Sequence, residues 1–186
     1  MPLPDPIQVQ RWVDRLKGGD RGAFRPLVDA FQGPLFGYLA RFTGDRHAAE
    51  DLFQEVFLKV HQEIAGQTAT GSFSGWVYSL AHNLAVDWLR RRGREELTAT
   101  VPETPAGRLE GELALPGADP TRLAEAVRQL PEPQRAVVCL RVYGELSFAQ
   151  IARILDAPLN TVLGRMRLAT VALRRALTPG WMEARV

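Results

Sequence analysis

The sequence predicts an all-helical fold of two small domains, an N-terminal helical bundle and a C-terminal helix-turn-helix, joined by a flexible linker. Three observations lead to this prediction. Hydrophobic residues recur at the i, i+3, i+4, i+7 spacing of amphipathic helices in both halves of the chain. A stretch between the halves has three prolines and no sustained periodicity. Two helical patterns near the C-terminus are joined by a tight turn. The predicted segments are an N-terminal domain over residues 1–93, a linker over 94–118, a C-terminal domain over 119–178 and a tail over 179–186.

The cysteine and histidine content argues against disulfide and metal chemistry. Cys139 is the single cysteine among the 186 residues, so no intrachain disulfide is possible, which suits a reducing cytoplasm. It lies in an apolar run, where a small buried side chain is favoured over a redox switch. His47, His61 and His82 have no cysteine or histidine at metal-ligand spacing. We therefore expect no metal and no cofactor.

Catalysis and membrane insertion are not expected either. The sequence has no phosphate-binding loop and no nucleophile–base constellation, so we expect no catalytic residues and no enzyme activity. No apolar run approaches the length of a membrane span, and the N-terminus lacks a secretory signal pattern. These features predict a cytoplasmic protein.

The net charge of +2 is unevenly distributed. Residues 1–93 hold 11 basic and 10 acidic residues, and residues 94–118 hold 2 and 5. Residues 119–186 hold 10 basic and 6 acidic residues, a net charge of +4. The basic excess at the C-terminal end indicates a nucleic-acid surface there.

The first 42 residues contain two amphipathic patterns. The first runs from Ile7 to Leu16 and is broken by Lys17-Gly18-Gly19-Asp20. The second is expected from about Arg21 to Phe31. Gly33-Pro34 is expected to interrupt or kink this helix before the pattern resumes over residues 35–42.

The stretch from Ala48 to Val60, AAEDLFQEVFLKV, combines an apolar stripe with a tight acidic cluster. Asp45, in the preceding turn, is the expected N-cap. A leucine, Leu58, lies on the polar side, one turn beyond the acidic cluster. A leucine there favours a docking face, although an ordinary amphipathic helix gives the same pattern. The other residues of the polar side are Glu50, Asp51, Gln54 and Glu55.

A helix with a mixed aromatic, amide and basic surface follows the loop over residues 65–74. Ser72 or Ser74 is expected to cap it, and Gly93 to end it after Arg92. Its apolar stripe includes Trp76, which we interpret as a core residue. Aromatic and amide groups followed by arginines suit single-stranded DNA, because aromatic rings stack on bases and arginines hold phosphates. A core helix with a solvated basic end is the alternative. The residues placed on its other faces are Tyr78, Asn83, Asp87, Arg90, Arg91 and Arg92.

The linker is long enough to separate the domains. As a flexible coil, residues 94–118 span roughly 25–30 Å. Fully stretched, they reach about 85 Å. Two domains so joined can occupy separate sites on one ligand.

The C-terminal domain begins with Asp119-Pro120, in the order favoured for N-cap and first helical residue. A second helix is expected from Pro131-Glu132-Pro133 to about Tyr143. Ser147 and Gln150 form a capping-box signature for a third. After the turn Asp156-Ala157-Pro158, a longer helix is expected over residues 159–177.

The last two helices predict a helix-turn-helix. The second of them has no acidic residue and carries Arg165, Arg167, Arg174 and Arg175. If its apolar residues face the core, a second face can enter a major groove, although a plain helical hairpin with a basic face is the alternative. The groove-facing residues would be Asn160, Thr161, Leu163, Gly164 and Arg167.

The run Glu50-Asp51-Leu52, Gln54-Glu55 and Phe57 resembles the core-polymerase-binding helix of bacterial sigma factors. In that family the helix docks on the clamp coiled coil of the RNA polymerase β′ subunit. The resemblance implies that core RNA polymerase, through its β′ and β subunits, is a partner. The residues implied for the β′ contact are Asp51, Gln54, Glu55 and Leu58.

The run FSGWVYSLAHNLAVDWLRRRGR resembles the minus-ten-element helix of extracytoplasmic-function (group IV) sigma factors of the sigma-seventy family. In the family this helix and the loop before it, here residues 66–72, hold the unpaired non-template strand with one base turned out. Asp87 would accept a hydrogen bond from a base or orient Arg90 or Arg91. The positions implied for minus-ten contacts are Tyr78, Asn83, Asp87, Arg90 and Arg91.

Residues 130–177 resemble the minus-thirty-five-recognition domain of the same family almost end to end. One departure stands out: Leu163 and Gly164 occupy positions where the family usually has Lys or Arg and then Ser. The chain therefore lacks a basic side chain at that phosphate or base contact. The residues implied for minus-thirty-five contacts are Asn160, Thr161, Arg165, Arg167, Arg174 and Arg175.

Taken together, these resemblances imply an alternative sigma factor that binds core RNA polymerase and directs promoter-specific transcription initiation. Promoter DNA is then a partner, and an anti-sigma protein is the expected inhibitor. The alternative is a helix-turn-helix regulator that binds duplex DNA without joining polymerase. That alternative explains the basic C-terminal domain but not the docking helix, and binding to core polymerase separates the two.

Overall fold

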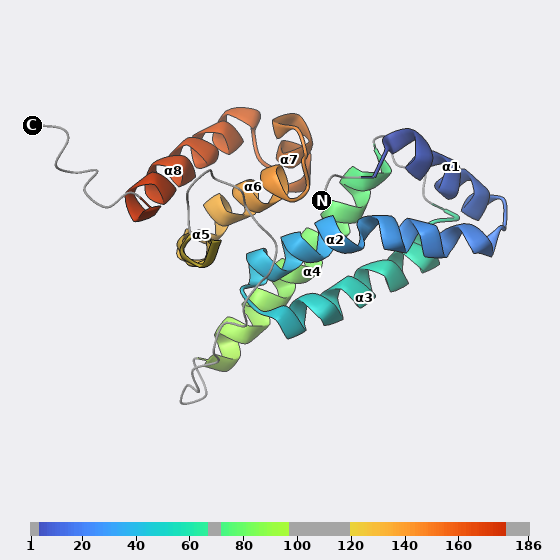
Figure 1. Cartoon of the computed structure of the whole chain (residues 1–186), viewed down its shortest axis with the longest axis horizontal. Coiled ribbons are helices and arrows are strands. Elements are labelled where there is room, and N and C mark those ends of the chain that lie inside the picture. The colour runs from blue at the N-terminus through green and yellow to red at the C-terminus, as the bar shows by residue number, and fades with distance from the viewer. Residues whose placement is uncertain (1–3, 67–71, 97–119, 178–186) are drawn as a thin grey trace, which may run out of the picture.

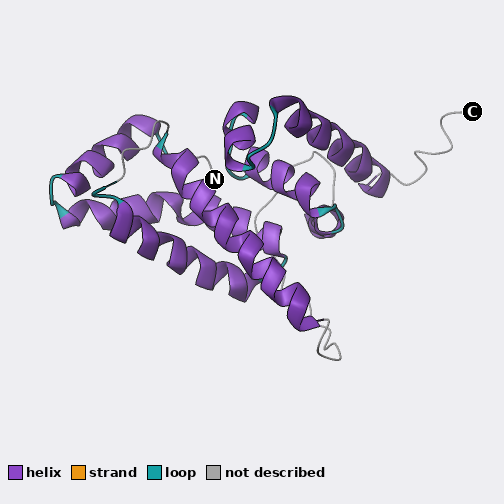
Figure 2. Ribbon diagram, turned by 180° about the vertical axis from the view of Figure 1, so that it is seen from behind, coloured by secondary structure: helices purple, strands orange, loops and turns teal. Residues whose placement is uncertain are grey.

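The computed structural model describes residues 4–66, 72–96 and 120–177. Within these residues it contains eight α-helices, one short 3-10 helix and no strand. Figure 2 shows the described part of the chain as helices joined by loops. The predicted all-helical fold is confirmed. The segment 97–119 lies outside the described residues, as do residues 67–71, so the linker, its Asp119 cap and most of the loop over 66–72 are not described.

The N-terminal bundle is built from α1 (Pro6–Lys17), the 3-10 helix η1 (Arg21–Ala23), α2 (Phe24–Thr43), α3 (Arg46–Glu63) and α4 (Phe73–Glu96), as Figure 1 shows. Side-chain caps fix where the helices begin. Asp45 Oδ1 accepts a hydrogen bond from the Ala48 N–H at 3.1 Å, so the predicted N-cap of α3 is confirmed. Ser72 Oγ accepts from the Gly75 N–H at 3.1 Å and caps α4.

Of the two outcomes predicted at Gly33-Pro34, an interruption or a kink, the interruption is wrong, because α2 is one helix of 20 residues that passes through Pro34. A proline inside a helix removes a backbone hydrogen bond and costs about 3 kcal/mol. Phe31, Leu35 and Tyr38 around it are completely buried. Burial of three such side chains outweighs that cost, since each contributes roughly 1.5–3 kcal/mol.

The predicted end of α4 at Gly93 is also wrong, because the helix continues to Glu96. Glycine inside a helix costs about 1 kcal/mol relative to alanine, and a Cβ at Gly93 would meet no atom within 4 Å. One glycine is therefore too weak a signal to stop a helix of 24 residues. The first residues of the predicted linker, Arg94 to Glu96, are helical.

The C-terminal helices are α5 (Pro120–Arg128), α6 (Glu132–Val142), α7 (Phe148–Ile154) and α8 (Leu159–Leu177). The predicted capping box is confirmed, with Ser147 Oγ accepting from the Gln150 N–H and Gln150 Oε1 accepting from the Ser147 N–H. Asp156 takes a left-handed conformation, with φ of 45°, in the turn between α7 and α8. This turn sets α8 across α7 as a helix-turn-helix.

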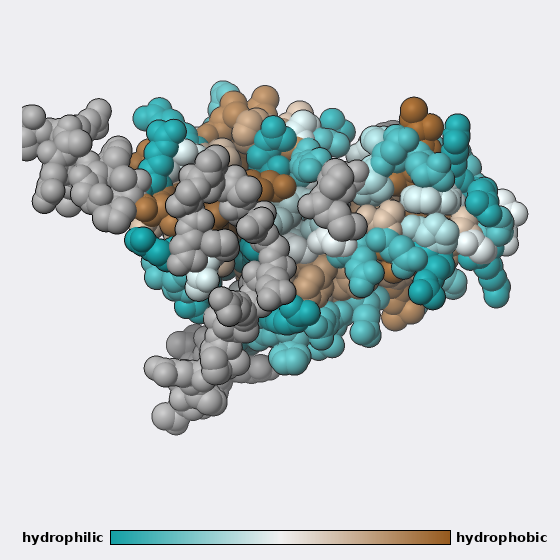
Figure 3. All heavy atoms as spheres, in the orientation of Figure 1, coloured by the Kyte–Doolittle hydropathy of each residue, from teal (hydrophilic) through white to brown (hydrophobic). Residues whose placement is uncertain are grey.

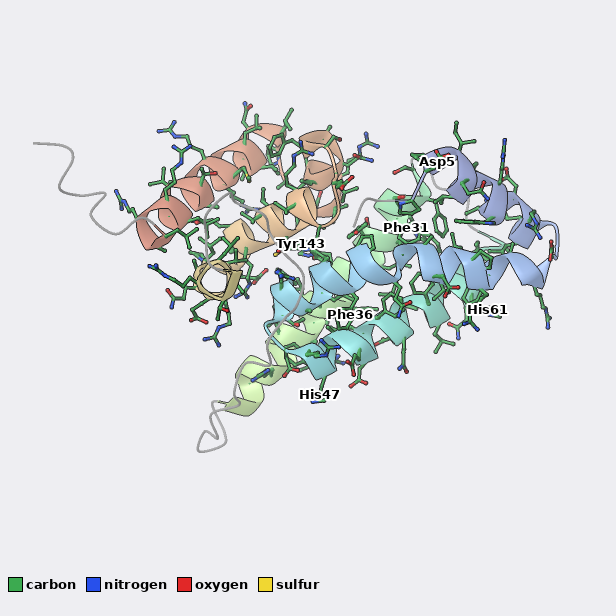
Figure 4. The ribbon with its side chains drawn as sticks, in the orientation of Figure 1. Asp5, Phe31, Phe36, His47, His61 and Tyr143 are labelled. Carbon is green, nitrogen blue, oxygen red and sulfur yellow. The ribbon has the colours of Figure 1, made fainter. Side chains whose placement is uncertain are left out.

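The two groups of helices pack on each other, with α6 against α2 and α7 against α4 (Figure 1). Tyr143, at the end of α6, lies at this junction, as Figure 4 shows. The Arg41 guanidinium stacks over the Tyr143 ring at 4.7 Å from its centroid. Gln150 Nε2 donates to Ser72 Oγ at 3.2 Å, which joins α7 to the start of α4. One hydrophobic core therefore extends through both groups of helices.

His82 and Cys139 are titratable groups that lie inside this core. His82 Nδ1 is 3.0 Å from Tyr38 Oη, and burial lowers the pKa of His82 to about 4, so its ring is neutral at pH 7. Cys139 is completely buried, and burial raises the pKa of its thiol to about 12. A thiol held in this state is a poor nucleophile, which agrees with the predicted packing role of Cys139.

Candidate docking and nucleic-acid surfaces

The outer face of α3 presents the predicted docking residues together. The apolar stripe of the helix is buried by α2 and α4, with Leu52, Val56 and Val60 inside the core. The side chain of Leu58 remains 58% exposed. This exposed apolar residue among carboxylates and an amide is the arrangement on which the docking prediction rests. The other exposed residues of this face are Glu50, Asp51, Gln54 and Glu55.

A groove of about 690 Å³ runs beside this face between α2 and α3. Phe36 lies in its floor, and the guanidinium of Arg46 stacks over that ring at 5.5 Å. Arg46 Nε also contacts Glu50 Oε1 at 3.3 Å. Figure 4 shows Phe36 between the two helices. Helix periodicity does not point to Phe36 or Arg46, because the groove exists only once α2 packs on α3.

Four of the five predicted minus-ten residues are exposed on α4: Asn83, Asp87, Arg90 and Arg91. Arg90 Nη1 lies 3.7 Å from Asp87 Oδ1, and both side chains are well exposed. Such a pair contributes little to stability. It matches the second of the two roles expected for Asp87, the orientation of an arginine one turn on.

Tyr78 differs from its predicted placement, because its side chain is fully buried. Its hydroxyl donates to the backbone carbonyl of Tyr143 at 3.2 Å, and its ring packs on Tyr38. The helical pattern put Tyr78 on an open face of α4, and packing of the C-terminal helices covers that face. In this arrangement of the domains, the Tyr78 ring cannot reach DNA.

The last arginine of the run 90–92 has a structural partner. Arg92 Nη1 contacts Asp45 Oδ2 at 2.9 Å, and its guanidinium lies over the Trp88 ring at 5.1 Å. Arg92 therefore links α4 to the N-cap of α3. The sequence carries no local signal of this contact, since the partners are 47 residues apart.

One side of α8 is buried in the C-terminal core, and the other side is exposed. Val162, Ala169 and Leu173 are buried in the C-terminal core. Asn160, Thr161 and Arg167 are exposed, as are Arg174 and Arg175, while Arg165 is half-buried. Figure 3 shows hydrophobic surface over α8 between polar residues. The exposed leucines of the helix are Leu159, Leu163 and Leu168.

The described part of the chain contains no group of three or more histidine, cysteine, aspartate or glutamate side chains that could hold a metal ion. Among the helices described, none is both long and apolar enough to cross a membrane.

The fold and its surfaces define a helical protein with an exposed acidic face on α3 and a basic helix-turn-helix. Residues 27–95 match the model of sigma-70 region 2, and residues 121–173 match that of sigma-70 region 4. The chain belongs to the extracytoplasmic-function sigma factors of the sigma-70 family, since the ECF RNA polymerase sigma factor SigK of Mycobacterium tuberculosis is 31% identical over 88% of this chain and 90% of SigK.

The match to relatives extends over nearly the whole chain. The RNA polymerase sigma-H factor of Pseudomonas aeruginosa is 32% identical, over 95% of this chain and 97% of that protein. The ECF RNA polymerase sigma factor SigW of Bacillus subtilis is 28% identical, over 92% of this chain and 97% of SigW.

Two solved structures share the fold, each at 20% sequence identity. The sigma factor RpoE of Bartonella quintana, solved with the anti-sigma factor NepR, aligns with a TM-score of 0.64 over 76% of this chain and 88% of RpoE. CnrH, solved with the cytosolic domain of CnrY, aligns with a TM-score of 0.65 over 98% of this chain and 99% of CnrH.

Proposed function

We propose that this chain binds core RNA polymerase through the outer face of α3 and directs transcription initiation at promoters read by α4 and α8. The observation that carries the proposal is the face of Asp51, Gln54, Glu55 and Leu58, which stays exposed although the apolar side of α3 is fully used in the core. A regulator that binds only duplex DNA needs no such face. The chain would act in the cytoplasm and contribute no catalytic group, since polymerase performs the chemistry.

The exposed surfaces of α8 and α4 would have different roles in promoter binding. The basic, exposed side of α8 would fix the protein on duplex DNA, because phosphate contacts position a protein and base contacts specify the sequence. The exposed residues of α4 would then capture bases of the melted strand. Binding energy from that capture offsets the few kcal/mol needed to unstack a base.

An anti-sigma protein is the inhibitor we propose. It would cover the docking face of α3 or the DNA-binding surface of α8. RpoE, which has the same fold, was solved in complex with the anti-sigma factor NepR, and this supports the proposal.

The proposal is tested by mixing the purified chain with core polymerase. We expect the two to co-purify, and the complex to transcribe from a subset of genomic promoter fragments that core alone does not use. A chain that binds duplex DNA but never co-purifies with core would be a helix-turn-helix regulator instead.

Asn83→Ala is expected to slow open-complex formation by about tenfold, the effect of removing one good base contact. Asn83 is exposed on α4, and its amide can both donate to and accept from a base edge. Permanganate reactivity of unpaired thymines measures the opening. The defect should persist on a template with a pre-melted bubble, because base capture itself is impaired.

Two controls accompany this variant. Gln10→Ala removes an exposed amide from α1 and should open promoters normally. Arg91→Ala should weaken binding to all sequences alike. If the Asn83 variant opens duplex promoters at the wild-type rate with unchanged sequence preference, Asn83 is not part of the minus-ten surface.

Removing arginines from α8 should reduce the salt dependence of duplex binding. Each arginine that holds a phosphate adds about 0.9 to the magnitude of the slope of log K against log[salt]. We expect the slope to fall by this amount for Arg167→Gln, and for Arg174→Gln or Arg175→Gln, in binding measured by fluorescence anisotropy. Arg25→Gln, a charge removed from the exposed surface of α2, is the control. Unchanged slopes in all the α8 variants would mean that α8 does not lie in the groove.

A further inference from the structure

The exposed face of α8 contains an apolar side chain that no contact within the described chain explains. Leu163 is 41% exposed, and it lies about a quarter turn around the helix from the buried stripe of Val162, Ala169 and Leu173. Arg167 follows one turn later on the same exposed side. An apolar group here makes no hydrogen bond and holds no phosphate.

The next residue, Gly164, is equally unexplained by the fold. It lies inside α8, where glycine costs about 1 kcal/mol relative to alanine. A Cβ at this position would meet no atom within 4 Å, so packing within the described chain does not require its absence. The surface of the helix backbone is therefore open at Gly164, directly beside the exposed leucine.

The charge of α8 indicates which kind of partner binds its exposed face. Between Leu159 and Leu177 α8 has no acidic residue, and it carries four arginines. This charge favours an anionic partner, and nucleic acid is the polyanion that a basic helix-turn-helix suits. In the major groove of duplex DNA, the C5-methyl group of thymine is the one apolar feature on the base edges.

We propose that Leu163 reads a thymine methyl group in the duplex contacted by α8, and that Gly164 lets the helix backbone approach the base edges closely enough for this contact. The proposal rests on the proposed function, because it assumes that α8 enters the major groove. It assigns one thymine preference in the minus-thirty-five element of this sigma factor to Leu163.

The first step of the test selects, from a randomised pool, the duplex that the protein binds. The full chain, bound to core polymerase, selects from duplex DNA with a randomised minus-thirty-five window. The selected duplex is then resynthesised with deoxyuridine in place of each thymidine in turn, a change that removes only the C5-methyl group. At one position the wild-type complex should bind the uridine duplex about fourfold more weakly, the effect of leaving one methyl group unburied.

Protein variants connect this effect to Leu163. In Leu163→Ala the thymine and uracil duplexes should bind within twofold of each other. Leu168→Ala, which truncates another exposed leucine of α8 on a different side, should keep the fourfold difference. Gly164→Ala should fold at least as stably as wild type, because alanine favours the helix, yet bind the selected duplex about tenfold more weakly.

Two results would overturn the proposal. One is a selected window without thymine, and the other is a set of uridine duplexes that wild type and Leu163→Ala discriminate equally. In either case the exposed leucines of α8 are better explained by a protein partner. Failure of the proposed function looks different: the chain then does not co-purify with core polymerase, or the complex selects no sequence and its duplex binding does not depend on Arg167.

Discussion

Replacing both Gln54 and Glu55 with alanine is expected to weaken core-polymerase binding by at least about 1,000-fold. The two side chains stand on the exposed side of α3, beside the exposed Leu58. The few hot-spot residues at the centre of a protein interface contribute about 2 kcal/mol or more each, and we expect these two to be among them. Removing two of them therefore eliminates most of the binding that a single helix face supplies, and transcription from the chain's own promoters should cease.

Stability should not change in this double variant, since both side chains lie outside the core. Circular dichroism is expected to show native helicity, and a core-binding assay measures the affinity. The matched control is Gln10→Ala with Asp14→Ala, which removes an exposed amide and carboxylate from α1. Wild-type affinity in the Gln54/Glu55 variant, with native helicity, would refute the docking assignment.

Gly144→Ala is expected to lower the free energy of unfolding by about 2–3 kcal/mol, the upper range for overpacking. A Cβ at this position would lie 2.6 Å from the Leu140 carbonyl oxygen. It would also lie 3.2 Å from Leu146 Cγ and from Tyr78 Cε1. The first neighbour is backbone, and the other two side chains are buried in the core, so none can move aside cheaply.

The matched control for this substitution is Gly93→Ala, because a Cβ there meets no atom within 4 Å. It should leave stability unchanged or raise it by up to about 1 kcal/mol, since alanine favours the helix. Urea denaturation followed by circular dichroism measures both variants. Equal stability of the Gly144 variant and wild type would mean that the segment after α6 is loosely packed against α4.

The local features of the fold were predictable because their causes lie within a few residues. The Asp45 cap of α3 and the Ser147–Gln150 capping box are hydrogen bonds across three residues, and both formed as predicted. The long helix over residues 159–177 was predicted with the bounds that the structure gives. The family followed from residues quoted in order along two domains, and the matches to sigma-70 regions 2 and 4 confirm it.

The candidate surfaces were predictable where helix periodicity alone decides exposure. Asp51, Gln54 and Glu55 oppose the buried stripe of α3, and Asn83 opposes that of α4. Phe36 and Arg46 were missed, because they join the docking face only through the packing of α2 on α3.

By itself, the sequence determined the helical class, the order of the domains, the caps and the family, since periodicity, capping and motifs are properties of neighbouring residues. Only the tertiary structure decided that α2 passes through Pro34 and that the segment after α6, with Tyr143, covers Tyr78. Both depend on contacts between segments far apart in the chain. Helix periodicity tells which side of a helix is apolar, but the exposure of Tyr78 depends on Tyr143, 65 residues further on, whose carbonyl accepts its hydrogen bond.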